Sequence, residues 1–416
     1  MPTQIQLFGY KSYMKALKVA AKVIPMPKPT LFTGVGSSIE LCEAISLIGI
    51  KKLLLVTDES IVRLGLLKPI QQALQDRGVE MAIFSQVQPD PTYLQVEAGL
   101  RIYLRCECDG ILAVGGGSPI DTAKVIAAKV HNPKPIHKLA GLFRVWKTPA
   151  PLFAIPTTAG TGSEVTIAAV VSDPDSHQKT PLIDPKLVPM MAALDPSIMV
   201  GLPRPITAAT GMDALTHAIE SYLSMNATNE TNGYALAAVK LVMTNLPLAY
   251  ENGENLVARQ NMAIASYYAG LAFTKASLGY VHAISHNLGA LYGVPHGLAN
   301  AIVLPYVLDF SQHATQPQLA ELFRATSNSN EEMSESKQAQ AFIQLVRQLQ
   351  QQLKIPATLD MLVENDISHL TKLALKEAHH NYPVPVYMGK KQCVQLLRSM
   401  MTPATVMDEA LPEPKQ

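Results

Sequence analysis

The stretch Ile111-Leu-Ala-Val-Gly-Gly-Gly-Ser-Pro-Ile-Asp121 indicates the fold most directly. Its first four residues form an apolar run of strand length, and three glycines follow at once. Ser118 suits a helix N-cap, Pro119 the first helical position and Asp121 the third, which is a capping-box arrangement. Glycines before a helix start let backbone N–H groups approach a phosphate closely, and the helix dipole favours negative charge there. A plain tight turn is the alternative interpretation.

A second polar loop follows the apolar run from Leu152 to Ile155. It reads Pro156-Thr-Thr-Ala-Gly-Thr-Gly-Ser-Glu164 and supplies hydroxyl groups and glycines where the run ends. Neither loop is a Gly-x-Gly-x-x-Gly or Walker sequence, so neither identifies a nucleotide site by itself. Two such loops in one chain favour phosphate binding over two plain turns.

Short apolar runs alternate with helical segments between Leu31 and about Met199. The runs are rich in aliphatic or β-branched residues and comprise Leu53–Val56, Val79–Phe84, Ile111–Val114, Leu152–Ile155 and Ile167–Val171. This alternation predicts a mainly parallel sheet joined by helical crossovers. Strand signals vanish after Pro203-Arg-Pro205. We therefore expect an arm or helix over residues 1–30, an α/β domain over 31–202 and an all-helical domain over 203–416.

Composition bounds the function. The chain has 416 residues, 48% hydrophobic and 16% charged, with a net charge of +1, so it lacks the basic field that nucleic acid requires. No apolar run reaches the roughly eighteen residues that indicate a membrane span. Four cysteines form no paired CxxC framework, which favours reduced thiols in a cytoplasmic protein. Five lysines precede the first acid, Glu40, and a transit peptide is the alternative to a packed arm there.

Metal-competent side chains gather in two later stretches. Asp213 and His217 are one helical turn apart, and His282 and His286 repeat that spacing on a second apolar run. His296 follows a Gly-Val-Pro break that would start a third helix. Imidazoles together with a carboxylate suit Fe²⁺ or Zn²⁺. Ordinary polar residues on helices are the alternative, but polar groups in such apolar surroundings need partners.

The order of these motifs resembles the iron-containing (group III) alcohol dehydrogenase family. The shared motifs are Val56-Thr-Asp58, Pro89-Asp-Pro-Thr92, both glycine loops, Ala193-Leu-Asp-Pro196, Gly211–Glu220 and the three later histidines. The resemblance runs from about Leu31 to the end and weakens after Tyr306. It implies an N-terminal α/β dinucleotide-binding domain, a C-terminal all-α metal-binding domain in a dehydroquinate synthase-like architecture, and a cleft between them for metal and NAD.

By position, the resemblance makes Asp213, His217, His282 and His296 the ligands of one Fe²⁺, with Zn²⁺ as the alternative ion. His286 then falls at a non-ligand position near the nicotinamide. We assign His286 to a proton relay with water and a ribose hydroxyl, and orientation of the cofactor is the alternative role.

The resemblance also implies the cofactor contacts. Asp58 would face the adenosine ribose, and its carboxylate would favour NAD over NADP because a 2′-phosphate would bring like charge against it. Asp90 stands where many relatives have Asn. The expected NAD-binding set is Asp58, Asp90, Gly115, Gly116, Gly117, Ser118, Asp121, Thr157, Thr158, Thr161 and Lys179.

These sites together predict a metal-dependent alcohol dehydrogenase. A divalent ion would lower the pKa of a substrate alcohol, so that the alkoxide expels hydride to NAD. No Lys or Arg occurs in residues 206–239 or 276–319, which argues for a small neutral alcohol or carbonyl substrate. A zinc-dependent polyol oxidoreductase of the glycerol dehydrogenase kind, or an inactive scaffold, are the alternatives. We expect a homodimer without nucleic-acid or membrane partners.

Overall fold

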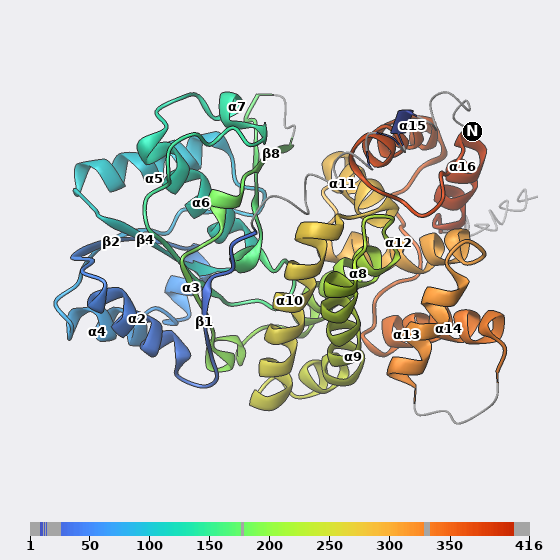
Figure 1. Cartoon of the computed structure of the whole chain (residues 1–416), viewed down its shortest axis with the longest axis horizontal. Helices are drawn as coiled ribbons and strands as arrows, with labels where there is room; N and C mark the ends of the chain where they lie inside the picture. Colours follow the sequence, from blue (N-terminus) through green and yellow to red (C-terminus); the bar gives the residue numbers. More distant parts are fainter. Residues whose placement is uncertain are drawn as a thin grey trace, which may run out of the picture.

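The computed structural model describes residues 26–175, 179–327 and 333–402, together with Gly9, Tyr10, Ser12 and Met14. An α/β part lies beside a helical part (Figure 1). Most of the N-terminal arm predicted over residues 1–30 lies outside the described residues.

Six parallel strands form the main sheet, in the order β1-β9-β6-β4-β2-β3. Their bounds are β1 Thr30–Thr33, β2 Lys52–Val56, β3 Glu80–Phe84, β4 Gly110–Gly115, β6 Leu152–Pro156 and β9 Met191–Leu194. The chain moves outward from β2 to β3, then crosses to the other side of β2 and continues through β4, β6 and β9. The direction of strand order therefore reverses between β2 and β4, and α/β sheets bind ligands at the carboxyl ends of strands beside such a reversal.

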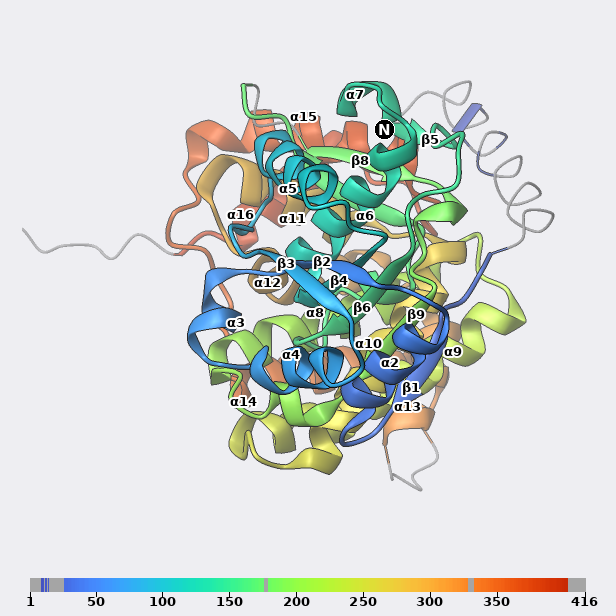
Figure 2. The same ribbon diagram turned by 90° about the vertical axis from the view of Figure 1, so that its left-hand side faces the viewer.

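Both faces of this sheet are buried, which explains why its strands read as continuous apolar runs. Leu53 and Leu55 pack in one core with α2 (Ser37–Leu47) and α4 (Lys68–Gln75). Leu54 and Val56 pack in the opposite core with α5 (Tyr93–Arg105) and α6 (Gly117–His131). Figure 2 shows the resulting three layers, with α5 and α6 on one side of the strands and α2 and α4 on the other.

One predicted run belongs to a different sheet. Residues Ala168–Ser172 form β7, which pairs antiparallel with β8 (Lys179–Ile183) in a three-stranded sheet completed by β5 (Gly141–Leu142). The connection from β7 to β8 is too short for the crossover that a parallel pair needs. The apolar run thus predicted a strand correctly, but it carried no signal of the separate sheet.

The predicted capping box at Ser118 is wrong. Helix α6 begins at Gly117, its N-cap is Gly116, and no side chain caps it. The Asp121 carboxylate instead accepts hydrogen bonds from the Ser163 hydroxyl at 2.5 Å and the Val170 N–H at 2.9 Å. The Asp121 carboxylate is therefore bound by tertiary donors, one in the second glycine loop and one in β7, and it does not cap α6.

Helices follow from Arg204 onward. They are α8 Arg204–Leu223, α9 Asn229–Glu251, α10 Leu256–Ala276, α11 Tyr280–Tyr292, α12 His296–Ser311, α13 Gln316–Thr326, α14 Glu335–Gln352, α15 Glu364–Asn381 and α16 Lys390–Ser399. They share one large apolar core. In Figure 1, α8 and α10 lie next to the α/β part, and α10 contacts β9 and the 3₁₀ turns Ser163–Val165 and Pro196–Met199. Within the described residues, no helix is long and apolar enough to cross a membrane.

Candidate metal and nucleotide site

Three helices bring four potential metal ligands together. Asp213 and His217 lie one turn apart on α8, His282 is in the first turn of α11, and His296 is the first residue of α12. The start of α12 lies directly against α8, because a Cβ on Gly297 would overlap the carbonyl oxygen of Ala209. The close approach of Gly297 to Ala209 therefore places His296 beside α8, although three helices separate α8 from α12 in the chain.

The ligand atoms of this group lie within 4.8 Å of one another. Asp213 Oδ1 is 3.9 Å from His217 Nε2, 3.7 Å from His282 Nε2 and 3.5 Å from His296 Nε2. Ligand atoms bound tetrahedrally to one ion at about 2.1 Å would stand about 3.4 Å apart. The donor types and their spacing therefore fit a borderline divalent cation such as Fe²⁺ or Zn²⁺.

The surroundings of Asp213, His217 and His296 favour the protonation states that metal ligands need. Burial lowers the pKa of His217 to about 4, although the charge of Asp213 opposes it. Burial likewise holds the pKa of His296 well below its usual value. For Asp213, burial acts to raise the pKa, but the neighbouring imidazoles bring it well below the ordinary range. A carboxylate and two neutral imidazoles are thus present at neutral pH.

The two glycine loops meet at the carboxyl ends of β4 and β6. The N–H of Thr157 donates to the carbonyl oxygen of Gly115 at 3.0 Å. A Cβ on Gly116 would lie 3.3 Å from the Thr158 hydroxyl oxygen, and one on Gly117 would lie 2.8 Å from Cγ2 of Thr161. Side chains at either glycine would therefore crowd the threonines of the second loop.

The second loop also reaches the metal-ligand helix. A Cβ on Gly160 would lie 2.8 Å from Cβ of Thr210, which is one turn before Asp213 on α8. The strand ends that favour phosphate binding and the cluster of metal-competent side chains are therefore neighbours. The spacing of these residues along the sequence does not predict that they lie close together.

Three other expected cofactor residues lie near strands: Asp58 follows β2, Asp90 is in the loop between β3 and α5, and Lys179 begins β8. Asp58 Oδ1 accepts the N–H groups of Ser60 at 2.8 Å and Ile61 at 3.1 Å, and so caps α3 (Glu59–Arg63). One carboxylate oxygen of Asp58 is thus engaged by the helix. Asp90 forms an ion pair with Lys179 at 2.8 Å, an association that the sequence did not reveal.

Comparison with known proteins identifies the family of the chain. A family model described as iron-containing alcohol dehydrogenase matches residues 28–196, and one for the C-terminal part of the Fe-containing alcohol dehydrogenase family matches residues 207–401. The chain belongs to the iron-containing alcohol dehydrogenase family.

Relatives of this family member cover most of its length. An NAD-dependent methanol dehydrogenase of Bacillus methanolicus is 38% identical over 84% of this chain and 92% of its own. A 1,3-propanediol dehydrogenase of Klebsiella pneumoniae is 38% identical over 81% of this chain and 88% of its own. The crystal structure of a 1,3-propanediol oxidoreductase superposes with a TM-score of 0.88 at 35% identity, covering 91% of this chain and all of that one.

Glu220 contacts the potential metal-ligand group of this alcohol dehydrogenase without belonging to it. Its carboxylate accepts the backbone N–H groups of Gly279 at 2.9 Å and Val281 at 2.7 Å, and it lies 2.6 Å from His282 Nδ1. Burial opposes protonation of His282, but the charge of Glu220 and bonds to Asp213 and Glu220 raise its pKa to about 9. Occupation of Nδ1 by a carboxylate turns Nε2 toward Asp213, as in many carboxylate–histidine–metal arrangements.

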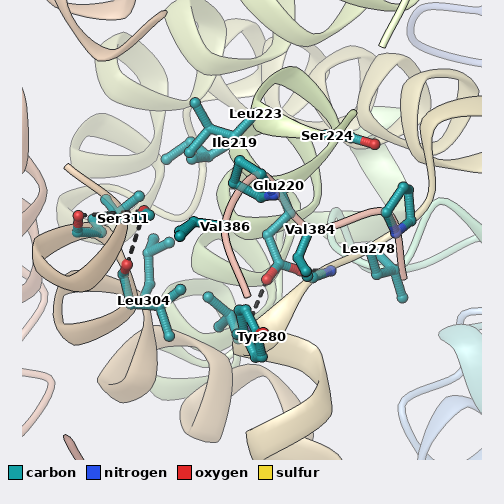
Figure 3. A pocket seen from close by; sticks show the side chains of 16 residues that line it. Ile219, Glu220, Leu223, Ser224, Leu278, Tyr280, Leu304, Ser311, Val384 and Val386 are labelled. Atoms are coloured by element: carbon teal, nitrogen blue, oxygen red, sulfur yellow. Dashed lines mark hydrogen bonds between the residues drawn. The ribbon is translucent and has the colours of Figure 1, made fainter. Parts of the chain in front are cut away.

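A small cavity lies beside Glu220. Figure 3 shows the Glu220 side chain reaching the start of α11 beside Tyr280, with Leu304 and Val384 on other walls. The cavity measures about 30 Å³, which is room for about one water molecule. It is too small for a cofactor, and the Glu220 side chain beside it is buried.

Asn300 touches three of the potential ligands at once. Its amide nitrogen lies 2.7 Å from Asp213 Oδ1, 3.1 Å from His296 Nε2 and 3.2 Å from His282 Nε2. Its position one turn after His296 on α12 was the available sequence signal, because i,i+4 residues share a helix face.

His286 lies outside the four-residue group. Its ring stacks on that of His296 with centroids 5.2 Å apart, and its side chain is 27% exposed, compared with 1% for His282. His286 Nδ1 lies 2.7 Å from Glu377 Oε1. Glu377 was missed from the sequence because it lies 91 residues away, where the family resemblance is weak.

Proposed function

We propose that this alcohol dehydrogenase oxidises a small neutral alcohol with NAD and reduces the corresponding aldehyde or ketone in the reverse direction. One observation carries the proposal: a carboxylate and three imidazoles converge beside glycine-rich strand ends in a chain of this family. Asp213, His217, His282 and His296 would hold one Fe²⁺. The similarity to the NAD-dependent methanol dehydrogenase of Bacillus methanolicus supports NAD as the hydride acceptor.

When bound, such an ion acts as a Lewis acid on the substrate oxygen. The protein's own groups do the remaining work. Gly115, Gly116, Gly117 and Ser118 would cradle the cofactor phosphates with backbone N–H groups. Thr157, Thr158 and Thr161 would line the nicotinamide-side ribose. These loops keep the hydride acceptor within reach of α8, because Gly160 packs on that helix.

His286 would move the proton in this scheme. Its ring lies beside His296 but outside the ligand group, and its partial exposure gives it a route to solvent. We therefore propose that His286 accepts the alcohol proton, directly or through water, and releases it to solvent.

The proposed roles of the remaining cofactor residues are based on their positions. Asp58, at the end of β2, would accept hydrogen bonds from the adenosine ribose with the carboxylate oxygen that the α3 cap does not use. The Asp90–Lys179 pair would form the outer edge of the same site. We also propose that residues 31–202 form the NAD-binding domain and 203–416 the metal-binding domain, which is supported by the start of α8 at Arg204.

The central test is a change of His282 to Ala. The variant should remain folded but lose both bound metal and NADH formation from a panel of short alcohols. Metal analysis and NADH absorbance measure the two losses separately. Full stoichiometric metal in the variant would remove His282 from the ligand set, and silence of the wild type with every alcohol would favour an inactive scaffold.

A further inference from the structure

Glu377 gathers three hydrogen-bond donors from two segments. His286 Nδ1 lies 2.7 Å from its Oε1, the Tyr382 hydroxyl donates to Oε1 at 2.9 Å, and the Asn287 amide donates to Oε2 at 3.1 Å. His286 and Asn287 are consecutive on α11, whereas Glu377 lies near the end of α15. Both carboxylate oxygens are therefore engaged, and the carboxylate has a fixed orientation toward the His286 ring.

This contact differs from an ordinary surface ion pair. On the same helix, Glu364 pairs with Arg398 while both side chains remain more than half exposed, at 54% and 56%. Glu377 is only 23% exposed and His286 27%. Exposed pairs contribute little, whereas a partly buried carboxylate needs its donors because desolvation is unfavourable. The convergence of three donors on Glu377 meets that need.

A carboxylate on Nδ1 selects the tautomer of the neutral ring. In the neutral imidazole, Nδ1–H donates to Glu377 and Nε2 carries the lone pair. The stacking of the His286 ring on His296, with planes 16° apart, fixes the second rotational degree of freedom. The imidazole is thus held in one tautomer and one plane, beside the group that would bind the substrate oxygen.

We propose that Glu377 is a positioning residue that holds His286 with Nε2 ready to accept the proton of the substrate alcohol. The inference rests on the proposed relay role of His286. In the oxidation, the hydride leaves carbon for NAD and the hydroxyl proton passes to Nε2, giving the carbonyl product and an imidazolium. Glu377 stabilises that imidazolium without taking its proton, and the proton then leaves to solvent.

The primary test compares Glu377→Gln with Glu364→Gln in the metal-loaded enzyme. Glutamine keeps the shape but removes the charge, so Glu377→Gln should slow single-turnover NADH formation about 10-fold or more, the lower bound for such supporting partners. Metal content and the KM values for alcohol and NAD should stay within about 2-fold of the wild type. Glu364→Gln removes an ion pair from the same helix and should leave the rate unchanged.

A double-mutant cycle with His286→Ala separates positioning from a merely structural role. If Glu377 acts through His286, Glu377→Gln should add no further loss in the His286→Ala background. A structural role would lower the rate by the same factor in both backgrounds, and that result would overturn the inference. Tyr382→Phe, which removes one donor and keeps the carboxylate, should give a smaller loss that also disappears with His286→Ala. It serves as the test if Glu377→Gln does not fold.

A readout independent of turnover is the nitrogen NMR spectrum of His286 in the full chain loaded with diamagnetic Zn²⁺. The wild type should show a protonated Nδ1 and an unprotonated Nε2, and Glu377→Gln should mix the two tautomers. A rate loss in His286→Ala together with a wild-type rate in Glu377→Gln would show that Glu377 does not position His286. The proposed relay role of His286 would then still stand. A wild-type rate in His286→Ala would remove the relay itself, and the inference with it.

Discussion

Glu220 is a buried carboxylate that contacts the proposed metal-ligand group without belonging to it. It holds His282 by Nδ1 and ties the first turn of α11 to α8 through the N–H groups of Gly279 and Val281. The direction of His282 Nε2 therefore depends on Glu220, and so does the helix start that carries His282.

Glu220→Gln should accordingly weaken metal binding about 10-fold to 100-fold, because the supporting charge is lost while the four ligands remain. Titration of the metal-free protein against a competing chelator measures this. Glu230→Gln is the matched control. It removes a partly exposed carboxylate on α9 that pairs with Lys28 and Lys275. Equal affinities in the two variants would show that Glu220 has no part in holding the metal.

Glu164 is a residue whose contribution to stability should depend on pH. It lies 2% exposed in the second glycine loop, and burial raises its pKa to about 7 although Lys124 opposes this. The folded protein thus keeps a proton that the unfolded chain releases near the ordinary pKa of 4.5. This stabilisation is complete below that value and is lost as the pH rises through about 7.

Glu164→Gln, which is always neutral, should therefore gain on the wild type as the pH rises. Between about pH 5 and about pH 7 the difference in free energy of unfolding should move by about 2 kcal/mol in favour of the variant. Denaturant unfolding at both pH values measures the change. Glu254→Gln, at an exposed position, should show no such trend. A pH-independent difference for Glu164→Gln would mean that Glu164 is ionised throughout.

At the scale of elements, the two glycine loops contact each other at the strand ends where we propose that the cofactor phosphates bind. Gly116→Ala would place a methyl group 3.3 Å from the Thr158 hydroxyl oxygen, at the strand ends where we place the phosphates. NAD binding should weaken about 10-fold, while the melting temperature changes little. Calorimetric titration with NAD measures this. Gly233→Ala on α9, where a Cβ meets nothing within 4 Å, is the control. Wild-type affinity in Gly116→Ala would move the phosphates elsewhere.

The elements also show which features a sequence can predict. The buried strands, the i,i+4 spacing of Asp213 and His217, and the helix start at His296 are local patterns, and the structure has them. The separate β7–β8 sheet and the absence of a side-chain cap on α6 depend on tertiary partners. Glu220 and Glu377 meet their histidines across 62 and 91 residues, and no local pattern encodes such pairings.

At the scale of the whole molecule, the second glycine loop joins the two parts. Gly162 has φ 61°, and a Cβ there would lie 2.8 Å from the Ser266 carbonyl oxygen of α10. Asp121 on α6 holds the same loop through Ser163. The nucleotide-side loop is therefore packed between the sheet and the helices, so its position relative to α8 is fixed by contacts on both sides.

Metal binding should stabilise this assembly, because its ligands come from the middle of α8 and the starts of α11 and α12. Without the ion, buried Asp213 and the three imidazoles keep their contacts with one another, with Asn300 and, at His282, with Glu220. At a free metal concentration about 100 times the Kd, binding contributes about 2.7 kcal/mol to the folded state. Chelation should thus lower the melting temperature by a few degrees, and adding back Fe²⁺ or Zn²⁺ should restore the original melting temperature.

His296→Ala is the control variant. It retains the fold contacts of α8 and α11 but lacks one ligand, so its melting temperature should respond much less to chelator. Equal responses of the wild type and His296→Ala would show that the stabilising ion binds outside this group.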